Sequence, residues 1–519
     1  MLNDFLETNI QNKLHIISIL HLKHSISLKE LSHELDLSVS GMNSIINELN
    51  LELREIAEIS KGPSSLKLLK FKKNITFTEL SHAIYKNSIV LQCLRYLVTN
   101  EKHEPFSNFI KDKFLTKSSA YRIRQHCSNY LHNIGLSIKN NTISGEEYRI
   151  RFFIALLYYK YGIDCCGMDK KSINIAREFI LSTNQQINLD FLNRTTNEYG
   201  YFECLFILSW KRQKYTLNFS HSNALDNLKR IFIYREIIAY VRSIVEPQLN
   251  LHFTENEYDY IFLAYCCANS CVLADKWSQE DIRQVHEIIF SDERFDNLLT
   301  LFGEHFGIEL KSSPELHSVL VYFYKKCLFD LQCIIPDKHY YLDVKKDPLV
   351  ILVKRQISTI LDIWKRENYI RYQIDKGHVA YLSLQISFIL RQFMKPVPVV
   401  VVADSTVELE IMKLYLSRTY PENRVRVQTV LINAQDISFL RQQQNSVVII
   451  KKSFEYIVDF LKIPTNCKIV FANIDINASD QQHILEAIVS FETNIFKNYV
   501  KQKQQKQLPA HYGTFLVRL

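Results

Sequence analysis

Side chains that bond well to phosphates and base edges gather in a short stretch beginning at residue 116. Hydroxyl, amide, lysine and arginine groups make most contacts of this kind. The pattern predicts a short helix over 106–113, a turn at Phe114-Leu115, and a second helix running to about residue 133. Thr116 or Ser118 would cap the second helix. Its first two turns would then present Lys117, Ser118, Ser119, Tyr121, Arg122, Arg124 and Gln125, as a recognition helix does.

A wing is predicted directly after this helix. Residues 134–138 and 142–145 alternate as short strands do, and Lys139-Asn140-Asn141 between them suits a tight turn. The helix and the wing together predict a winged helix-turn-helix in which Lys139 also reaches the duplex. The alternative is a basic face exposed to solvent. The core side of the helix is predicted to be Ala120, Ile123, Cys127, Tyr130 and Leu131.

A second helix pair is predicted nearer the N-terminus, between residues 26 and 50. Ser27 can cap its first helix, with Glu30 completing a capping box. Leu37 would be the buried turn residue before the next helix. That helix would turn Met42, Ile45, Ile46 and Leu49 inward. The small polar residues expected to face a duplex are Ser38, which also caps the helix, Ser40, Asn43, Ser44 and Asn47.

The helices of this first module are not basic, so its hold on phosphate would come from the segment that follows. Residues 56–71 read as two strands around Lys61-Gly62, which predicts a wing that carries Lys61. The alternative is a helical hairpin used for packing or for contact with another protein.

The placement of charge agrees with two nucleic-acid contacts. The net charge of +8 is modest. Between residues 105 and 151, however, eight basic residues stand against three acidic ones, a balance of +5. Between residues 54 and 73, six stand against two, a balance of +4. Each basic island coincides with one predicted module.

Length and composition predict a large, mainly helical, cytoplasmic protein. A chain of 519 residues has room for about three to five domains, and 11 glycines and 11 prolines leave few turns. We expect no export signal, and the apolar stretch 399–403 is far shorter than the ~20 residues of a membrane helix. The spacing of the 11 cysteines predicts neither disulfides nor a metal site, and no cofactor is expected.

The segment from Ile134 to Arg151 carries a family resemblance. Its sequence, Ile-Gly-Leu-Ser-Ile-Lys-Asn-Asn-Thr-Ile-Ser-Gly-Glu-Glu-Tyr-Arg-Ile-Arg, resembles the wing and exit helix of the Mga/AtxA family of virulence regulators. The glycine and the Glu-x-x-x-Arg pattern carry the likeness. The resemblance implies two winged helix-turn-helix domains, two regulatory domains of the phosphotransferase-system type (PRDs), and a C-terminal domain similar to an EIIB subunit.

The middle of the chain is expected to form the two all-helical PRD-like domains. Residues 253–264 and 374–385 look like corresponding late helices, and 314–326 look like the opening helix of the second domain. In such domains phosphorylated histidines report sugar supply, because phosphate adds charge and strong acceptors. Ala264 and Gln385 stand where the later histidines would be expected. The phosphorylation candidates are His221, His252, His317 and His378.

The C-terminal region predicts a small α/β domain. Residues 396–403, 425–432, 446–450 and 468–472 read as buried strands with helices between them, which resembles an EIIB subunit. Such an enzyme carries a nucleophilic cysteine at the end of its first strand, where this chain has Ala403-Asp404-Ser405. Because an aspartate there would repel phosphate, we expect dimer contacts or ligand sensing instead of phosphoryl transfer.

These interpretations predict a homodimeric, non-enzymatic transcription regulator that binds double-stranded promoter DNA. Phosphocarrier proteins of the phosphotransferase system are further candidate partners, and no membrane partner is expected. Two alternatives stay open: an RNA-binding antiterminator that shares the PRDs, and a protein-interaction scaffold. The expected parts are a first winged helix-turn-helix (1–73), a second (74–150), PRD-like domains 1 (151–278) and 2 (279–395), an EIIB-like domain (396–500) and a C-terminal tail (501–519).

Overall fold

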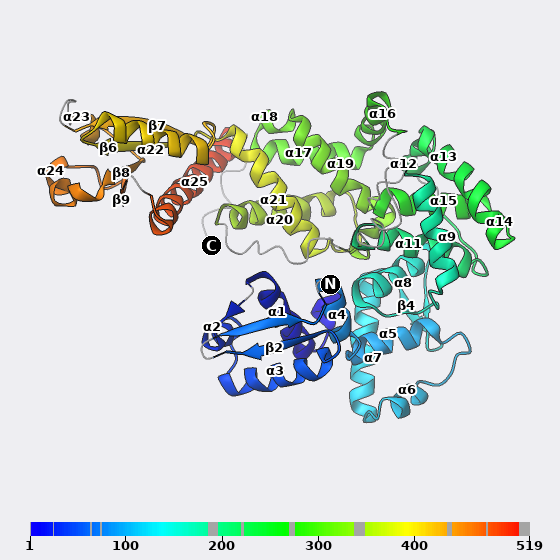
Figure 1. The fold of residues 1–519 in the computed structure, drawn as a ribbon. Coiled ribbons are helices and arrows are strands. Elements are labelled where there is room, and N and C mark those ends of the chain that lie inside the picture. The colour runs from blue at the N-terminus through cyan, green and yellow to red at the C-terminus, as the bar shows by residue number, and fades with distance from the viewer. Residues whose placement is uncertain are drawn as a thin grey trace, which may run out of the picture. The chain divides into compact units, whose positions relative to one another are not determined.

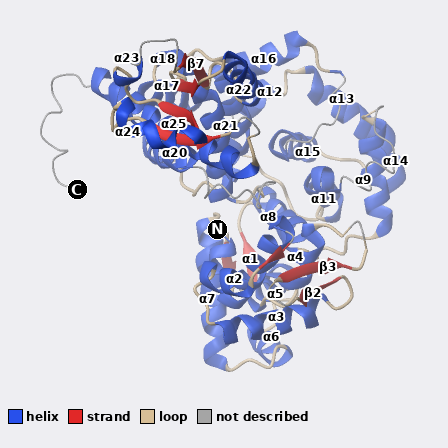
Figure 2. Cartoon of the chain, turned by 60° about the vertical axis from the view of Figure 1, so that its left-hand side comes forward, coloured by secondary structure: helices blue, strands red, loops and turns tan. Residues whose placement is uncertain are grey.

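The chain folds into two compact units, seen here in a computed structural model. Unit 1 comprises Met1–Asp292, Tyr322–Tyr341 and Ile370–His378, and unit 2 comprises Glu293–Val321, Leu342–Tyr369 and Val379–Leu519. Figure 1 labels their elements, and Figure 2 shows that helices dominate. The structure describes residues 2–23, 25–62, 65–72, 75–184, 196–219, 223–268, 276–336, 348–432, 438–473 and 476–507.

The first module of unit 1 is a winged helix-turn-helix with a three-stranded antiparallel sheet of order β1-β3-β2. Ser27 caps α2 by accepting a hydrogen bond from the backbone N–H of Glu30 at 3.1 Å. The core forms where Leu31 of α2 and Met42, Ile46 and Leu49 of α3 are buried. The elements are η1 (Leu2–Phe5), α1 (Thr8–Lys23), β1 (Ser25–Ile26), α2 (Leu28–Glu34), α3 (Val39–Leu53), β2 (Ala57–Lys61) and β3 (Leu66–Lys70).

The second module is a winged helix-turn-helix whose wing is a two-stranded hairpin. Thr76 and Glu79 form a capping box at the start of the module. Its recognition helix packs on α5 through the buried Cys127 and Leu131. The elements are α4 (Phe77–Tyr85), α5 (Ile89–Thr99), α6 (Phe106–Asp112), α7 (Lys117–Asn133), β4 (Ser137–Lys139), β5 (Thr142–Ser144) and the exit helix α8 (Glu147–Tyr161).

The rest of unit 1 is helical, and α11 packs closely on α8. Thirteen of the fifteen residues of α8 are buried, so this helix is surrounded by its neighbours. The elements are α9 (Lys170–Ser182), α11 (Thr196–Lys211), α12 (Asn223–Leu228), α13 (Phe232–Tyr240), the π-helix η2 (Val241–Val245), α14 (Glu246–Leu249), α15 (Glu255–Ala268), α16 (Gln279–Phe290) and η4 (Lys325–Cys333).

A buried ion-pair network fixes α8 to its neighbours. The fully buried guanidinium of Arg151 donates to Glu147 at 3.0 Å and to both oxygens of Glu257, on α15, at 2.7 and 2.9 Å. Arg212, just after α11, donates to the same Glu147 carboxylate at 2.7 and 2.9 Å. Because each buried charge has a bidentate or shared partner, the network keeps one arrangement of the three helices.

Unit 2 combines helices with a four-stranded parallel sheet of order β7-β6-β8-β9. One face of β6 packs on α22 and α25, and the other packs on α23 and α24. The strands are β6 (Val397–Ala403), β7 (Val425–Leu431), β8 (Val447–Lys451) and β9 (Lys468–Ala472). The helices are α17 (Glu293–Phe306), α18 (Ile308–Lys311), α19 (Pro314–Tyr324), α20 (Pro348–Glu367), α21 (Lys376–Phe393), α22 (Thr406–Thr419), α23 (Ser438–Arg441), η6 (Lys452–Ile457), α24 (Val458–Leu461) and α25 (Ala478–Gln507).

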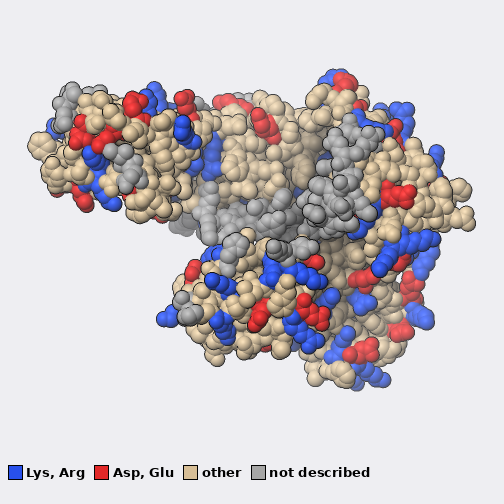
Figure 3. Space-filling view, in the orientation of Figure 1, with Lys and Arg blue, Asp and Glu red and all other residues tan. Residues whose placement is uncertain are grey.

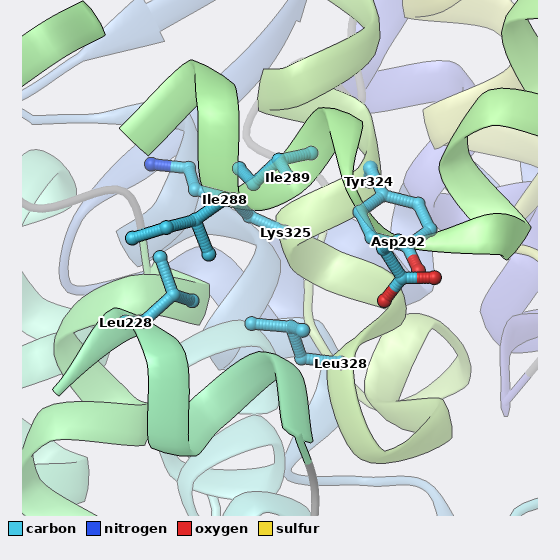
Figure 4. A pocket seen from close by; sticks show the side chains of 7 residues that line it. All are labelled: Leu228, Ile288, Ile289, Asp292, Tyr324, Lys325 and Leu328. Carbon is cyan, nitrogen blue, oxygen red and sulfur yellow. The ribbon is translucent and has the colours of Figure 1, made fainter. Parts of the chain in front are cut away.

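The cavities of unit 1 differ greatly in size. A mostly apolar pocket lined by Leu228, Ile288, Leu328 and their neighbours has a volume of about 10 Å³ (Figure 4), which is enough for one water molecule. A polar cavity of about 420 Å³ lies between β5, the start of α8 and residues 212–218. In the described part of the chain, no helix is both long and apolar enough to cross a bilayer.

Candidate nucleic-acid interface

The start of α7 presents a polar, partly basic surface. Thr116, not Ser118, is the cap, because its hydroxyl accepts from the backbone N–H of Ser119 at 3.3 Å. The predicted core side is buried except for Ile123, which is half-buried. Of the predicted contact residues, Lys117, Ser118, Tyr121, Arg122 and Gln125 are exposed, while Ser119 and Arg124 are half-buried.

Arg124 is held by its own module. Its Nη2 donates to Oδ1 of Asn141 in the wing at 3.2 Å, and its guanidinium carbon lies 5.5 Å from the ring centre of Phe106. Its Nε is buried and has no hydrogen-bond partner among the described residues. The geometry therefore gives Arg124 the role of joining the recognition helix to the wing, which its spacing alone did not reveal.

The tip of this wing is a tight turn anchored from behind. Asn140 and Asn141 have φ of 50° and 58°, the left-handed conformation that asparagine tolerates in a two-residue hairpin turn. The buried Asn100 donates to the carbonyl of Asn141 at 3.0 Å and accepts from the N–H of Glu104 at 2.8 Å. Lys139, at the end of β4, is exposed beside this turn.

The first module offers a smaller polar surface. Ser38 caps α3 by accepting from the N–H of Gly41 at 3.1 Å. Lys61 at the wing donates to Oδ1 of Asn43 on α3 at 2.8 Å, so the wing and the recognition helix are joined directly. The buried Lys13 pairs with both Glu48 and Glu52 and offsets one of the two negative charges near the end of α3. Of the predicted contact residues, Ser38, Ser40, Ser44, Asn47 and Lys61 are exposed, and Asn43 is half-buried.

The basic island of the second module, residues 105–151, has a smaller net charge on the surface than its sequence balance of +5. Arg149 and Arg151 are buried and serve internal contacts, as does Glu147. Six basic residues then remain against Asp112 and Glu146, a balance of +4. Figure 3 shows lysine and arginine side chains interspersed with acidic ones on the visible face of both modules.

Arg149 ties the second wing to the helical part of unit 1. Its guanidinium donates to the carbonyls of Ile134 and Asp330, each at 3.1 Å, and of Phe329 at 2.7 Å. It also lies 4.6 Å from the ring centre of Tyr372. Gly135, with φ of 76°, lies against the same tyrosine, whose hydroxyl a Cβ at this position would hit. Gly135 and Arg149, both from the segment that carries the family resemblance, thus meet at one junction.

The turn between α6 and α7 contains a residue whose importance the sequence did not signal. Phe114 has φ of 51°, and its side chain is 96% exposed. From the sequence it is only a turn residue. A single aromatic between two helices can equally well be buried in the core, so its exposure could not be predicted.

Comparison with known proteins agrees with this arrangement. The model of the Mga helix-turn-helix domain matches residues 73–158, which contain the second module from α4 through its wing and most of α8. The model of the PRD domain of the M protein trans-acting positive regulator (MGA) matches residues 176–391. Together the two matches cover more than half of the chain. The chain belongs to the Mga family of PRD-containing transcription regulators. No curated protein gave a match.

The first module and the C-terminal α/β domain lie outside both Mga matches. At the end of β6, Asp404 does not stand alone, because Lys451 of β8 bonds to it at 3.3 Å and to Glu408 at 2.8 Å. The lysine lowers the pKa of Asp404. Two carboxylates and one ammonium leave this edge with a balance of −1, so its repulsion of phosphate stays a prediction.

The candidate histidines of this Mga-family chain have different environments. His252 has a 94% exposed side chain whose Nδ1 lies 3.1 Å from a Glu246 oxygen. His317 is half-buried, and its Nε2 donates to the carbonyl of Lys311 at 2.7 Å. His378 is buried. His221 lies outside the described residues.

His378 is held as a neutral imidazole. Its Nε2 donates to the carbonyl of Ile335 at 3.0 Å, and its Nδ1 accepts from the buried ammonium of Lys326 at 3.2 Å. Burial, followed by the charge of Lys326, lowers the pKa of His378 to about 3. In this arrangement both ring nitrogens are engaged, so neither can receive a phosphoryl group without opening of the site.

The adjacent cysteines of α15 are buried thiols. Burial raises the pKa of Cys266 to about 12 and raises that of Cys267 as well, whereas a metal-binding thiolate needs a lowered pKa. Cys271 lies outside the described residues. Within the described ranges, histidine, cysteine and acidic side chains form no group of three or more placed to hold a metal ion.

Proposed function

We propose that this Mga-type regulator binds double-stranded promoter DNA with both N-terminal modules. The observation that carries the proposal is the polar face at the start of α7, where Lys117, Ser118, Tyr121, Arg122 and Gln125 are exposed. Lys139 is exposed on the wing, which Arg124 joins to this helix. Donors at the start of a recognition helix can enter the major groove, while wing lysines contact phosphate. The corresponding face of α3 supports a second, weaker contact.

Salt dependence of binding tests this proposal. The full chain is titrated into a labelled duplex from the region upstream of its own gene at several salt concentrations, with a single-stranded RNA as competitor. Arg122→Ala should reduce affinity by about 5- to 150-fold, or lower the salt slope by about one if Arg122 contacts phosphate. The matched control is Arg235→Ala, which removes an exposed arginine of α13, outside both modules and α22.

Four results would count against the proposal. No salt-sensitive binding to duplex would reject it, and preferential binding to RNA would favour an antiterminator. Equal effects of the two arginine variants would remove α7 from the interface. A chain that binds neither nucleic acid but captures a protein would support the scaffold.

We propose further that the active form is a homodimer that pairs through unit 2. Val407, Ile411 and Leu414 of α22 are large apolar side chains that are 65%, 45% and 53% exposed, and they share one helix face. A two-fold axis would let two copies of this stripe cover each other. Sedimentation analysis of Ile411→Glu tests the pairing, and this variant should be monomeric. The control is Glu410→Gln, at an exposed polar neighbour. If Ile411→Glu still forms a dimer, this face is excluded.

Modulation by phosphorylation is proposed for His252 and His317, because their side chains are reachable. For His378 the same modification would first require the Lys326 contact to open. Promoter output of His317→Asp should differ from that of His317→Ala, since only the aspartate mimics added negative charge. Equal output of the aspartate and alanine variants at both positions would remove the phosphate switch.

A further inference from the structure

The two modules contain the same turn between their helices, but a different residue occupies its left-handed position. That residue is Asp36 in the first module and Phe114 in the second. In the first module Asp36 has φ of 52°, its N–H donates to His33, and the N–H of Leu37 donates to Ser32. In the second, Phe114 has φ of 51°, its N–H donates to Lys111, and the N–H of Leu115 donates to Ile110. In each case the helix cap follows two residues later.

Phenylalanine is the unfavourable choice at this position. Aspartate enters the left-handed region at little cost, whereas a bulky side chain there costs on the order of 1 kcal/mol. The ring gains nothing inside the fold in return, because it is 96% exposed, while Phe106 and Phe109 of the adjacent α6 are 5% and 2% exposed. The first module shows that the turn forms without an aromatic, so the ring must be explained by something outside the chain.

The surroundings of the ring indicate what it meets. Lys111, Lys113 and Lys117 are exposed within three residues of Phe114, with Asp112 as the only acid in that stretch. The partner should therefore be a polyanion that also offers an apolar edge. A duplex has both, since phosphates line the groove while deoxyribose and the thymine methyl group are apolar.

We propose that Phe114 is an apolar DNA-contacting residue, which packs against the sugar and base edge where α7 enters the groove. The inference rests on the proposed function and adds a contact that is independent of charge. Because the ring carries no charge, its removal should weaken binding without changing the number of counterions released.

Binding isotherms on the same labelled duplex at several salt concentrations test the contact. Phe114→Asn, which suits the left-handed backbone, should weaken binding at least about fivefold, the lower end for one base contact. Its salt slope should equal that of the unmodified chain, and Phe114→Leu should recover part of the affinity. The control is Tyr369→Asn, because Tyr369 also has a positive φ of 53° and is 89% exposed, outside both modules.

The possible outcomes distinguish failure of the Phe114 contact from failure of DNA binding itself. If the unmodified chain binds no duplex, the proposed function itself fails. If it binds and Phe114→Asn binds equally well, or if the variant lowers the salt slope as Lys117→Ala should, the apolar contact is refuted. A photo-crosslinking phenylalanine analogue at position 114 should label the DNA strand, and labelling of a protein partner instead would overturn the assignment.

Discussion

His378 shows how strongly surroundings can change one residue. From the sequence it is a phosphorylation candidate on a well-matched helix. In the fold it is a buried neutral ring that accepts from Lys326 and donates to Ile335. Its depressed pKa means that the unfolded chain, in which histidine titrates near 6.5, binds a proton that the native chain does not.

This difference predicts how stability depends on pH. Above about 6.5 the native state keeps its full stability, and as the pH falls from 6.5 toward about 3, His378 costs up to about 1.4 kcal/mol per pH unit. His378→Gln offers Lys326 a neutral acceptor and should flatten this slope in thermal melts. The control, His252→Gln, removes an exposed ring and should leave the slope in place. An unchanged slope in His378→Gln would contradict the neutral assignment.

The wing of the second module depends on contacts that no local pattern shows. Its strands and its Asn-Asn turn follow from alternation and turn chemistry, and the sequence predicted them. Asn100 and Arg124, which hold the tip, come from elements 41 and 17 residues before Asn141. The wing is therefore a local hairpin whose position is set by distant side chains.

Removing either anchor should loosen the tip. Asn100→Ala leaves the N–H of Glu104 and the carbonyl of Asn141 without this partner, at a cost of about 1–3 kcal/mol. Hydrogen exchange at residues 139–142 should speed up, and DNA affinity should fall with an unchanged salt slope. Arg124→Ala should do the same, and the double variant should lose less than the sum, because both act on Asn141. Asn133→Ala, which removes an exposed amide at the end of α7, is the control; strict additivity would argue against a shared anchor.

At the scale of the whole molecule, the sequence predicted the type of each part better than the long-range contacts that join the parts. Caps at Ser38 and Thr116, helical periodicity and the valine-rich strand β6 are local signals, and they gave two winged modules, a helical middle and a parallel sheet. Arg149 and Arg151 were counted as surface charge, because nothing local shows that their partners are Glu257 and residues 329–330. These two arginines are buried because each bonds to a residue more than a hundred positions away in the chain. A single sequence does not reveal such pairings.

Arg149 should consequently govern whether the second module and the helices of unit 1 unfold together. It bonds Ile134, the C-cap of α7 just before the wing, and η4 at the same time, so Arg149→Gln should leave carbonyls on both sides without it. We expect a loss of about 3 kcal/mol or more, a second transition in calorimetry, and faster exchange at 134–138 and 326–335. Arg230→Gln, at an exposed site of unit 1, is the matched control. A single unshifted transition in Arg149→Gln would show that the module is coupled to the helices by other contacts.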